Sequence, residues 1–148
     1  MFFKKKHFSN AEENQIVRHI KAVEEKTSGE IRVYVESKVG GEDITKRAIQ
    51  VFGELRMHLT AHKNAVLIYI AKEDRRFAVL GDAGIHHKVG IEFWSQEAAH
   101  LKKEFDAVGL ARGVCNSIVR IGASLHRHFP LLTERGLNEL PDAPVYGV

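Results

Sequence analysis

The sequence contains a group of oxygen-bearing side chains that could bind a hard metal ion. Asp82 follows an apolar run and has glycines on both sides, and Asn64 directly precedes another apolar run. Carboxylate and amide oxygens, together with backbone carbonyls near glycines, suit Ca²⁺ or Mg²⁺ better than softer metals. The candidate metal ligands are Asp82, Asn64, Glu30 and His58, with Thr27 and Ser28 close to them. For Asp82 and Asn64 a structural role is the alternative, because both residue types form turns and helix caps.

A second, weaker group of charged side chains is a candidate for another cation site or for binding phosphate. It consists of Glu36, Asp43, Glu73 and Asp74, with Arg75 beside them. Charges of this kind near the tip of a hairpin are more often simply solvated, and that structural interpretation is the preferred one.

The chain has nine histidines, which is unusual for its 148 residues. His58 and His62 have the spacing of two zinc ligands on one helical face, and His86-His87 could join them. The residues around His62 indicate, however, that the preceding helix has already ended. In addition, no Cys or Glu has the position that a zinc motif requires relative to these histidines.

No motif for covalent catalysis is present, and no catalytic residue can be named. The sequence has neither a G-x-S-x-G elbow nor a Walker-type loop. Cys115 cannot begin a C-x5-R phosphatase loop, because Ile121 occupies the arginine position and Arg120 lies one residue too early. We interpret Cys115 as a small core residue on a helix.

The candidate ligands are positioned by two short apolar runs. Residues 65–71 and 77–80 are rich in Val, Ile, Tyr and Phe, which is typical of strands that are buried on both faces. The charged residues 72–76 between them fit a hairpin connection. The two runs are therefore predicted to be antiparallel neighbours in the centre of a sheet and not at its edge.

The segment before these runs is predicted to form a helix and then a strand. Ser9 and Glu12 have the spacing of a capping box, which predicts a helix start. Thr27-Ser28-Gly29 is expected to end this helix, with Gly29 in the left-handed conformation that follows many helices. Residues 30–36 then alternate between apolar and polar side chains, which predicts a strand buried on one face only.

A second helix, capped by Asp43, is predicted between this strand and the central pair. A strand, a helix and a parallel strand make a right-handed crossover. This topology brings the start of the first strand, the loop before the second and the end of the third to one end of the sheet. The second charged group would lie at the opposite end. The residues that would converge at the first end are Thr27, Ser28, Glu30, His58, Asn64 and Asp82.

The rest of the chain is predicted to be mainly helical. Residues 85–89 are expected to form a short turn, and a third helix runs from about residue 92 to 105. Gly109 is expected to break the chain before a fourth helix, which Pro130 ends. The tail, residues 131–148, shows no helix or strand pattern, so it is expected either to lie extended across the domain or to be mobile.

These elements predict an α/β fold, a three-layer α/β/α sandwich with a small mixed sheet and about four helices. Residues 1–8 are assigned to an N-terminal extension, 9–130 to the domain and 131–148 to an extended C-terminal tail.

The formal charge of +3 is well mixed along the chain, which argues against nucleic-acid binding. No apolar run is long enough to cross a membrane, no secretion signal is recognised, and the single cysteine fits a reducing compartment, so a cytoplasmic location is expected.

The sequence resembles the TPM domain family, particularly its small stand-alone bacterial members. The motifs that carry this resemblance are Thr27-Ser28-Gly29-Glu30-Ile31-Arg32-Val33, Met57-His58-x-Thr60 before Asn64-Ala65-Val66-Leu67-Ile68-Tyr69, Asp74-Arg75-Arg76-Phe77-Ala78-Val79-Leu80-Gly81-Asp82-x-Gly84-Ile85, and the ending Leu137-Asn138-Glu139-Leu140-Pro141-Asp142. The resemblance implies an α/β/α sandwich around a small mixed sheet. It also implies that loops at one end of the sheet bind calcium or magnesium, as in some bacterial relatives.

Three functional hypotheses follow. The first is a divalent-cation binding protein with Asp82 as the principal ligand. The second is a metal-assisted acid phosphatase, which rests on a plant relative of the family and would use the cation to polarise phosphate and activate water. The third is a non-enzymatic module that uses the tail and the mildly basic surface to hold a protein partner.

Overall fold

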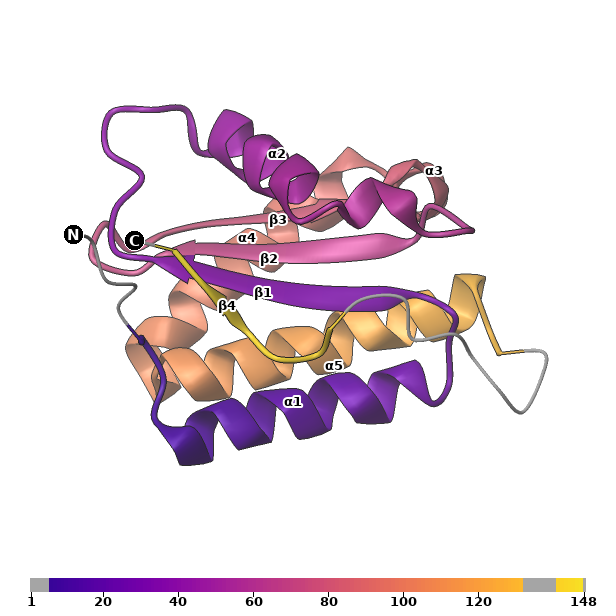
Figure 1. Cartoon of the computed structure of the whole chain (residues 1–148), viewed down its shortest axis with the longest axis horizontal. Coiled ribbons are helices and arrows are strands. Elements are labelled where there is room, and N and C mark those ends of the chain that lie inside the picture. Colours follow the sequence, from indigo (N-terminus) through magenta and orange to yellow (C-terminus); the bar gives the residue numbers. More distant parts are fainter. Residues whose placement is uncertain (1–5, 132–140, 148) are drawn as a thin grey trace.

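A four-stranded mixed sheet forms the middle layer of the computed structural model, which describes residues 6–131 and 141–147 (Figure 1). The strand order is β3-β2-β1-β4. The strands are β1 (Glu30–Glu36), β2 (Ala65–Ala71), β3 (Arg76–Gly81) and β4 (Val145–Tyr146). β1 runs parallel to β2 and to β4, and β2 runs antiparallel to β3. The predicted crossover and hairpin are therefore confirmed.

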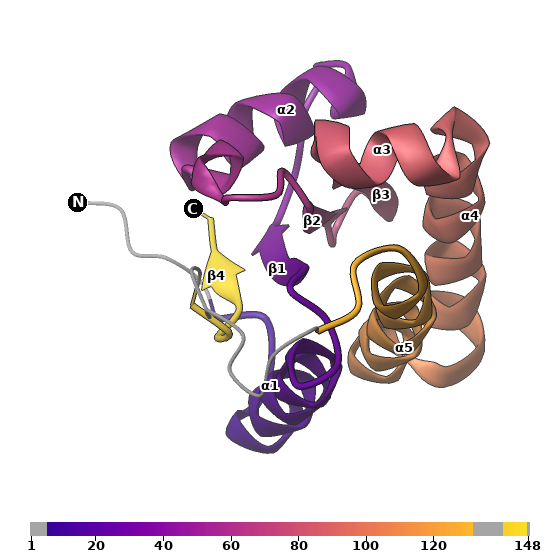
Figure 2. The ribbon, with the colours of Figure 1, turned by 90° about the vertical axis from the view of Figure 1, so that its right-hand side faces the viewer.

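Helices cover both faces of this sheet, which confirms the three-layer sandwich (Figure 2). The helices α1 (Asn10–Glu24), α4 (Ile91–Val108) and α5 (Leu110–His128) lie on one side. On the other side lie α2 (Ile44–Glu54) and the short 3₁₀ helix η1 (Met57–Leu59), and α3 (Ala83–Val89) follows β3 at the end of the sheet. The described residues thus contain five α-helices rather than about four, because residues 83–89 form a helix and not a single turn.

The start of α1 agrees with the sequence, but its end does not. Ser9 accepts a hydrogen bond from the Glu12 amide at 3.1 Å and donates its own amide to the Glu12 carboxylate at 2.9 Å, so the capping box is confirmed. The helix ends at Glu24, and Gly29 does not have a positive φ. A Cβ atom at Gly29 would lie 2.5 Å from a methyl carbon of Leu125. Glycine is therefore needed there for close packing against α5 and not for a left-handed turn.

The prediction that β1 is half-buried is wrong, since all seven of its residues are buried. Ile31, Val33 and Val35 face the larger core under α1 and α5. On the opposite face Tyr34 belongs to a second core under α2, and the buried carboxylate of Glu36 is hydrogen-bonded to Arg47. An alternating pattern reports side-chain polarity, and polar side chains can also be buried when they are hydrogen-bonded.

The prediction that both apolar runs lie in the centre of the sheet is correct for β2 and wrong for β3. β3 is an edge strand, because β4 joins the sheet on the far side of β1. Its sequence is apolar on both faces because α2 and α4 pack against the two faces of the strand (Figure 2). Side-chain burial does not show whether a strand has a neighbour, since the neighbours pair through backbone groups.

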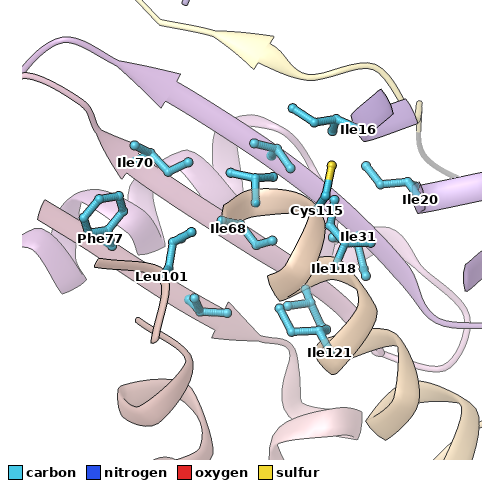
Figure 3. Close-up of a cluster of buried hydrophobic side chains, with 14 of the residues drawn as sticks. Ile16, Ile20, Ile31, Ile68, Ile70, Phe77, Leu101, Cys115, Ile118 and Ile121 are labelled. Carbon is cyan, nitrogen blue, oxygen red and sulfur yellow. The ribbon is translucent and has the colours of Figure 1, made fainter. Parts of the chain in front are cut away.

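Two hydrophobic cores lie on the two sides of the sheet. Figure 3 shows part of the larger one, in which side chains of α1, β1, β2, β3, α4 and α5 interlock. Cys115 on α5 is 2% exposed within it, as the sequence predicted. The smaller core lies between α2 and the sheet and contains Met57, Leu67 and Tyr69. Gly109, with a φ of 91°, makes the break between α4 and α5 that the sequence predicted.

Both ends of the chain contribute to the fold where the structure describes them. In the predicted extension, Phe8 is 3% exposed and belongs to the larger core. In the predicted tail, residues 141–147 lie extended, and β4 pairs with Tyr34 and Val35 although the sequence shows no strand pattern there. Residues 132–140, which include most of the ending that resembles the family, lie outside the described residues. Within the described parts of the chain, no helix is long and apolar enough to cross a membrane.

Candidate functional site

Three of the polar residues singled out in the sequence meet at one end of the sheet. Ser28 precedes β1, Asn64 precedes β2, and Asp82 follows β3. The side-chain amide of Asn64 donates a hydrogen bond to the Ser28 hydroxyl at 3.1 Å. The backbone amide of Asp82 donates to the carbonyl of Ala65, the residue after Asn64, at 2.9 Å. The parallel and antiparallel registers thus bring three distant segments together.

Asp82 has a structural role and also an oxygen without a hydrogen-bond partner. It is the N-cap of α3, and its Oδ1 accepts a hydrogen bond from the Ala83 amide at 2.7 Å. Its Oδ2 is buried and accepts no hydrogen bond from any described residue. A buried carboxylate oxygen without a partner is costly, which favours a bound cation or another donor at this place.

Backbone carbonyls of the loop before β2 lie against the first turn of α3. The amide of Ile85 donates to the Lys63 carbonyl at 3.3 Å. A Cβ atom at Gly84 would lie 2.2 Å from the His62 carbonyl oxygen and 2.6 Å from that of Lys63. Only glycine fits so close to these two carbonyl oxygens. Gly84 therefore allows the loop before β2 to lie against the start of α3, next to Asp82.

Glu30 and His58 contribute to other parts of this sheet end. Glu30 is 1% exposed, and its negative charge acts to raise the pKa of Glu24 and that of Arg32. His58 lies in η1, and its carbonyl accepts a hydrogen bond from the Lys63 ammonium. His58 and His62 do not share a helical face, because η1 ends at Leu59. Among the described residues, no group of three or more His, Cys, Asp and Glu side chains is arranged to hold a metal ion.

Glu24 and Asp142 form a carboxyl pair that the sequence did not reveal. Burial raises the pKa of Glu24 from its ordinary value of 4.5 to about 9, and the hydrogen bond to Asp142 and the charges of Asp142 and Glu30 act in the same direction. Burial also lowers the pKa of Arg32, while Asp142 and Glu30 oppose that change. The pair joins the end of α1 to the C-terminal segment, so no local pattern could have predicted it.

The residues of the second charged group have structural partners. The carboxylate of Glu36 accepts hydrogen bonds from Arg47 at 2.8 and 3.0 Å and from the hydroxyl of Tyr69. Asp43 caps α2 by accepting from the Thr45 amide at 2.8 Å, as predicted. Asp74 accepts from the Val39 amide at 2.7 Å and thereby fixes the loop after β1.

A further ion cluster joins α4 to α5. Arg120 contacts Glu97 at 2.9 Å and Glu104 at 2.6 Å, and Glu97 is 4% exposed. One signal could have identified it, because Glu97 lies three residues after Trp94 and four before Leu101, in the middle of the apolar stripe of α4. A buried acid at such a position requires a cationic partner close to it.

A pocket of about 590 Å³ lies along β3 between α2 and α4. Its walls are mainly apolar and include Ile49 and Phe52 of α2 and Ile91 of α4. His86 also lines the pocket, where its Nδ1 accepts a hydrogen bond from the Trp94 indole at 2.9 Å. Asp82 lies at the end of the pocket where β3 ends. Sequence analysis missed this pocket, because its walls come from segments that are far apart in the chain.

The fold and this sheet end define a class of protein: a single α/β/α sandwich with polar loops gathered at one end of a mixed sheet. A family model described as the TPM domain matches residues 3–124, which is most of the chain. The protein therefore belongs to the TPM domain family.

Solved structures agree with this assignment. The chain is similar to the BA42 protein from the psychrophilic bacterium Bizionia argentinensis, with 35% sequence identity and a TM-score of 0.87, covering 99% of this chain and 100% of that one. The N-terminal domain of a protein from P. gingivalis has the same fold at 15% identity and a TM-score of 0.66, covering 82% of this chain and 78% of that one. A comparison with curated proteins found no match.

Proposed function

We propose that the protein binds a divalent cation, Ca²⁺ or Mg²⁺, at the end of the sheet around Asp82. The observation that carries this proposal is the buried Oδ2 of Asp82, which no described residue satisfies. Further hard ligands would be the side chain of Asn64 and backbone carbonyls of the neighbouring loop, with water completing the shell. These groups fit either ion, since both prefer oxygen.

The proposed site is weak, because the affinity of such sites depends on the number of carboxylates. Asp82 is the one carboxylate that we assign to it, whereas tight calcium sites use several. We therefore expect a dissociation constant of roughly 0.1–1 mM, the range of calcium sites with few charged ligands.

The test is a titration of Ca²⁺ and then Mg²⁺ followed by amide NMR shifts, with Asp82→Asn as the variant. Asparagine also caps helices, so α3 should persist while the charge is lost. We expect saturable shifts at residues 28–30, 62–65 and 81–84 in the wild-type protein and their loss in the variant. Asp43→Asn is the matched control, because Asp43 is likewise an N-cap aspartate, at the start of α2.

Two results would contradict the proposal. One is the lack of saturable shifts up to several millimolar metal. The other is loss of binding in Asp43→Asn but not in Asp82→Asn, which would move the site to the opposite end of the sheet.

Acid phosphatase activity stays a prediction of the family resemblance. It requires turnover of p-nitrophenyl phosphate that rises with added metal and falls in Asp82→Asn. A cytoplasmic location likewise stays a prediction.

A further inference from the structure

The outer edge of β3 has backbone groups without partners. In the antiparallel β2–β3 pair, every second residue of β3 directs its backbone groups towards β2. The hydrogen bond from the Asp82 amide to the Ala65 carbonyl, at 2.9 Å, shows which residues these are. Leu80 and Ala78 therefore bond to β2, while the amides and carbonyls of Phe77, Val79 and Gly81 point away from it. None of these three residues bonds through its backbone to another segment among the described residues.

This edge forms the floor of the pocket between α2 and α4. All six residues from Phe77 to Asp82 line it, which means that the pocket runs along the strand. Phe77 and Val79 are only 9% and 3% exposed, so their outward backbone groups are recessed. Recessed N–H and C=O groups without protein partners favour a ligand that supplies hydrogen bonds at the spacing of a strand.

The walls of the pocket present apolar side chains that the fold does not use. Ile49 on α2 is 58% exposed and Ile91 at the start of α4 is 74% exposed, and both line the pocket. Phe52 and Ala98 continue the two walls. Alternate side chains of an added strand point to opposite faces of the sheet, so one set would contact α2 and the other α4.

The residues at the two ends of β3 carry opposite charges. Asp82 lines the pocket at the end of the strand, and Arg76 lies at its start, just before the first lining residue, where its guanidinium donates to the Glu42 carbonyl at 3.4 Å. A segment antiparallel to β3 would place its N-terminal end near Asp82 and its C-terminal end near Arg76. Charge complementarity therefore favours a basic residue at the start of the segment and an acidic residue at its end.

We propose that this pocket binds an extended peptide segment of a partner protein, which adds to β3 as a fifth, antiparallel strand. The segment has about five residues in the pocket, with apolar side chains at alternate positions, a basic residue before them and an acidic residue after them. A second copy of this chain fits less well, because β3 is recessed and the α2 and α4 helices of both copies would meet before the two edges paired.

The probe is a displayed library of seven-residue peptides, selected against the full-length protein. We expect enrichment of peptides with the alternating pattern and charge order described above. With an enriched peptide, the amide protons of Phe77, Val79 and Gly81 should become protected from hydrogen exchange. Those of Ala78 and Leu80 should change little, because they are already bonded to β2.

Variants at the walls supply the control. Ile49→Glu and Ile91→Glu should each weaken peptide binding roughly tenfold or more, since each removes an apolar contact and adds a charge. Val119→Glu is the matched control, because Val119 on α5 is 56% exposed and does not line the pocket. Both proposals use the carboxylate of Asp82, but cation shifts around Asp82 should persist in Ile91→Glu, so loss of peptide binding in this variant is distinguished from loss of the cation site.

Three outcomes would overturn the proposal. The first is that no peptide with alternating apolar residues is enriched. The second is that enriched peptides protect amides away from β3, or bind Val119→Glu as weakly as Ile91→Glu. The third is a dimer, detected by sedimentation of the wild-type protein and abolished in Ile91→Glu, which would assign the edge to a second copy of the chain.

Discussion

At the scale of single residues, Gly84 shows how closely the loop before β2 approaches α3. Alanine at this position would place its Cβ 2.2 Å from the His62 carbonyl oxygen, which is backbone and cannot rotate away. We expect Gly84→Ala to cost on the order of 2–3 kcal/mol in the free energy of unfolding, measured by urea denaturation, because the loop must move. The displaced loop should also weaken cation binding around Asp82.

Gly53 is the control for this prediction. It lies within α2, and a Cβ atom there would meet nothing within 4 Å. Gly53→Ala should therefore stabilise the protein by about 0.5–1 kcal/mol, since alanine loses less backbone entropy in a helix than glycine does. Equal effects of the two substitutions would show that the contact at Gly84 is not restrictive.

At the scale of elements, a buried ion pair fastens α2 to the sheet. Glu36 on β1 is held by Arg47 of α2 and by Tyr69 of β2, and its side chain is 7% exposed. Burial, the hydrogen bond to Glu36 and its charge raise the pKa of Tyr69, so the hydroxyl stays protonated and remains a donor. Replacing Glu36 would leave the Tyr69 hydroxyl without its acceptor and Arg47 without its nearest counter-ion.

We expect Glu36→Ala to destabilise the protein by about 3 kcal/mol, because it leaves the partly buried Arg47 with only the more distant Glu54, at 4.0 Å, as a counter-ion. The measurement is again urea denaturation. The control is Asp106→Ala, which breaks an ion pair with Arg75 whose two side chains are 50% and 59% exposed. Exposed pairs contribute only about 0–1 kcal/mol, so a large effect there, or a small one at Glu36, would contradict this view of the network.

At the scale of the whole molecule, the carboxyl pair of Glu24 and Asp142 links the C-terminal segment to α1. In the folded protein the pKa of Glu24 is raised to about 9, whereas in the unfolded chain it returns to about 4.5. Between these values the folded state holds a proton that the unfolded state has lost. The contribution of Glu24 to the free energy of unfolding is therefore fully present below about pH 4.5, and it is lost as the pH rises towards 9.

We expect Glu24→Gln to remove this decrease, because glutamine stays neutral at every pH. The measurement is the free energy of unfolding at several values between about pH 5 and 9 for the wild-type protein and the variant. Glu25→Gln serves as the control, since Glu25 is exposed at the end of the same helix. A wild-type slope that persists in Glu24→Gln, or that disappears in Glu25→Gln, would show that another group titrates.

Local sequence was sufficient to predict the elements and most of the fold. The capping box of Ser9, the Asp43 cap, the hairpin between β2 and β3 and the break at Gly109 all depend on residues a few positions apart. The crossover then follows from the handedness of such connections. These local features are enough to place Asn64 and Asp82 at the same end of the sheet.

Tertiary structure alone decided what surrounds those elements. Whether β3 has a neighbour depends on backbone pairing, and β4 joins β1 through two residues whose own sequence has no strand pattern. The pairing of Glu24 with Asp142 and the pocket along β3 join segments that are distant in the chain. The physical reason is that side-chain periodicity encodes which face of an element is buried, whereas edges, pockets and long-range ion pairs depend on which elements become neighbours.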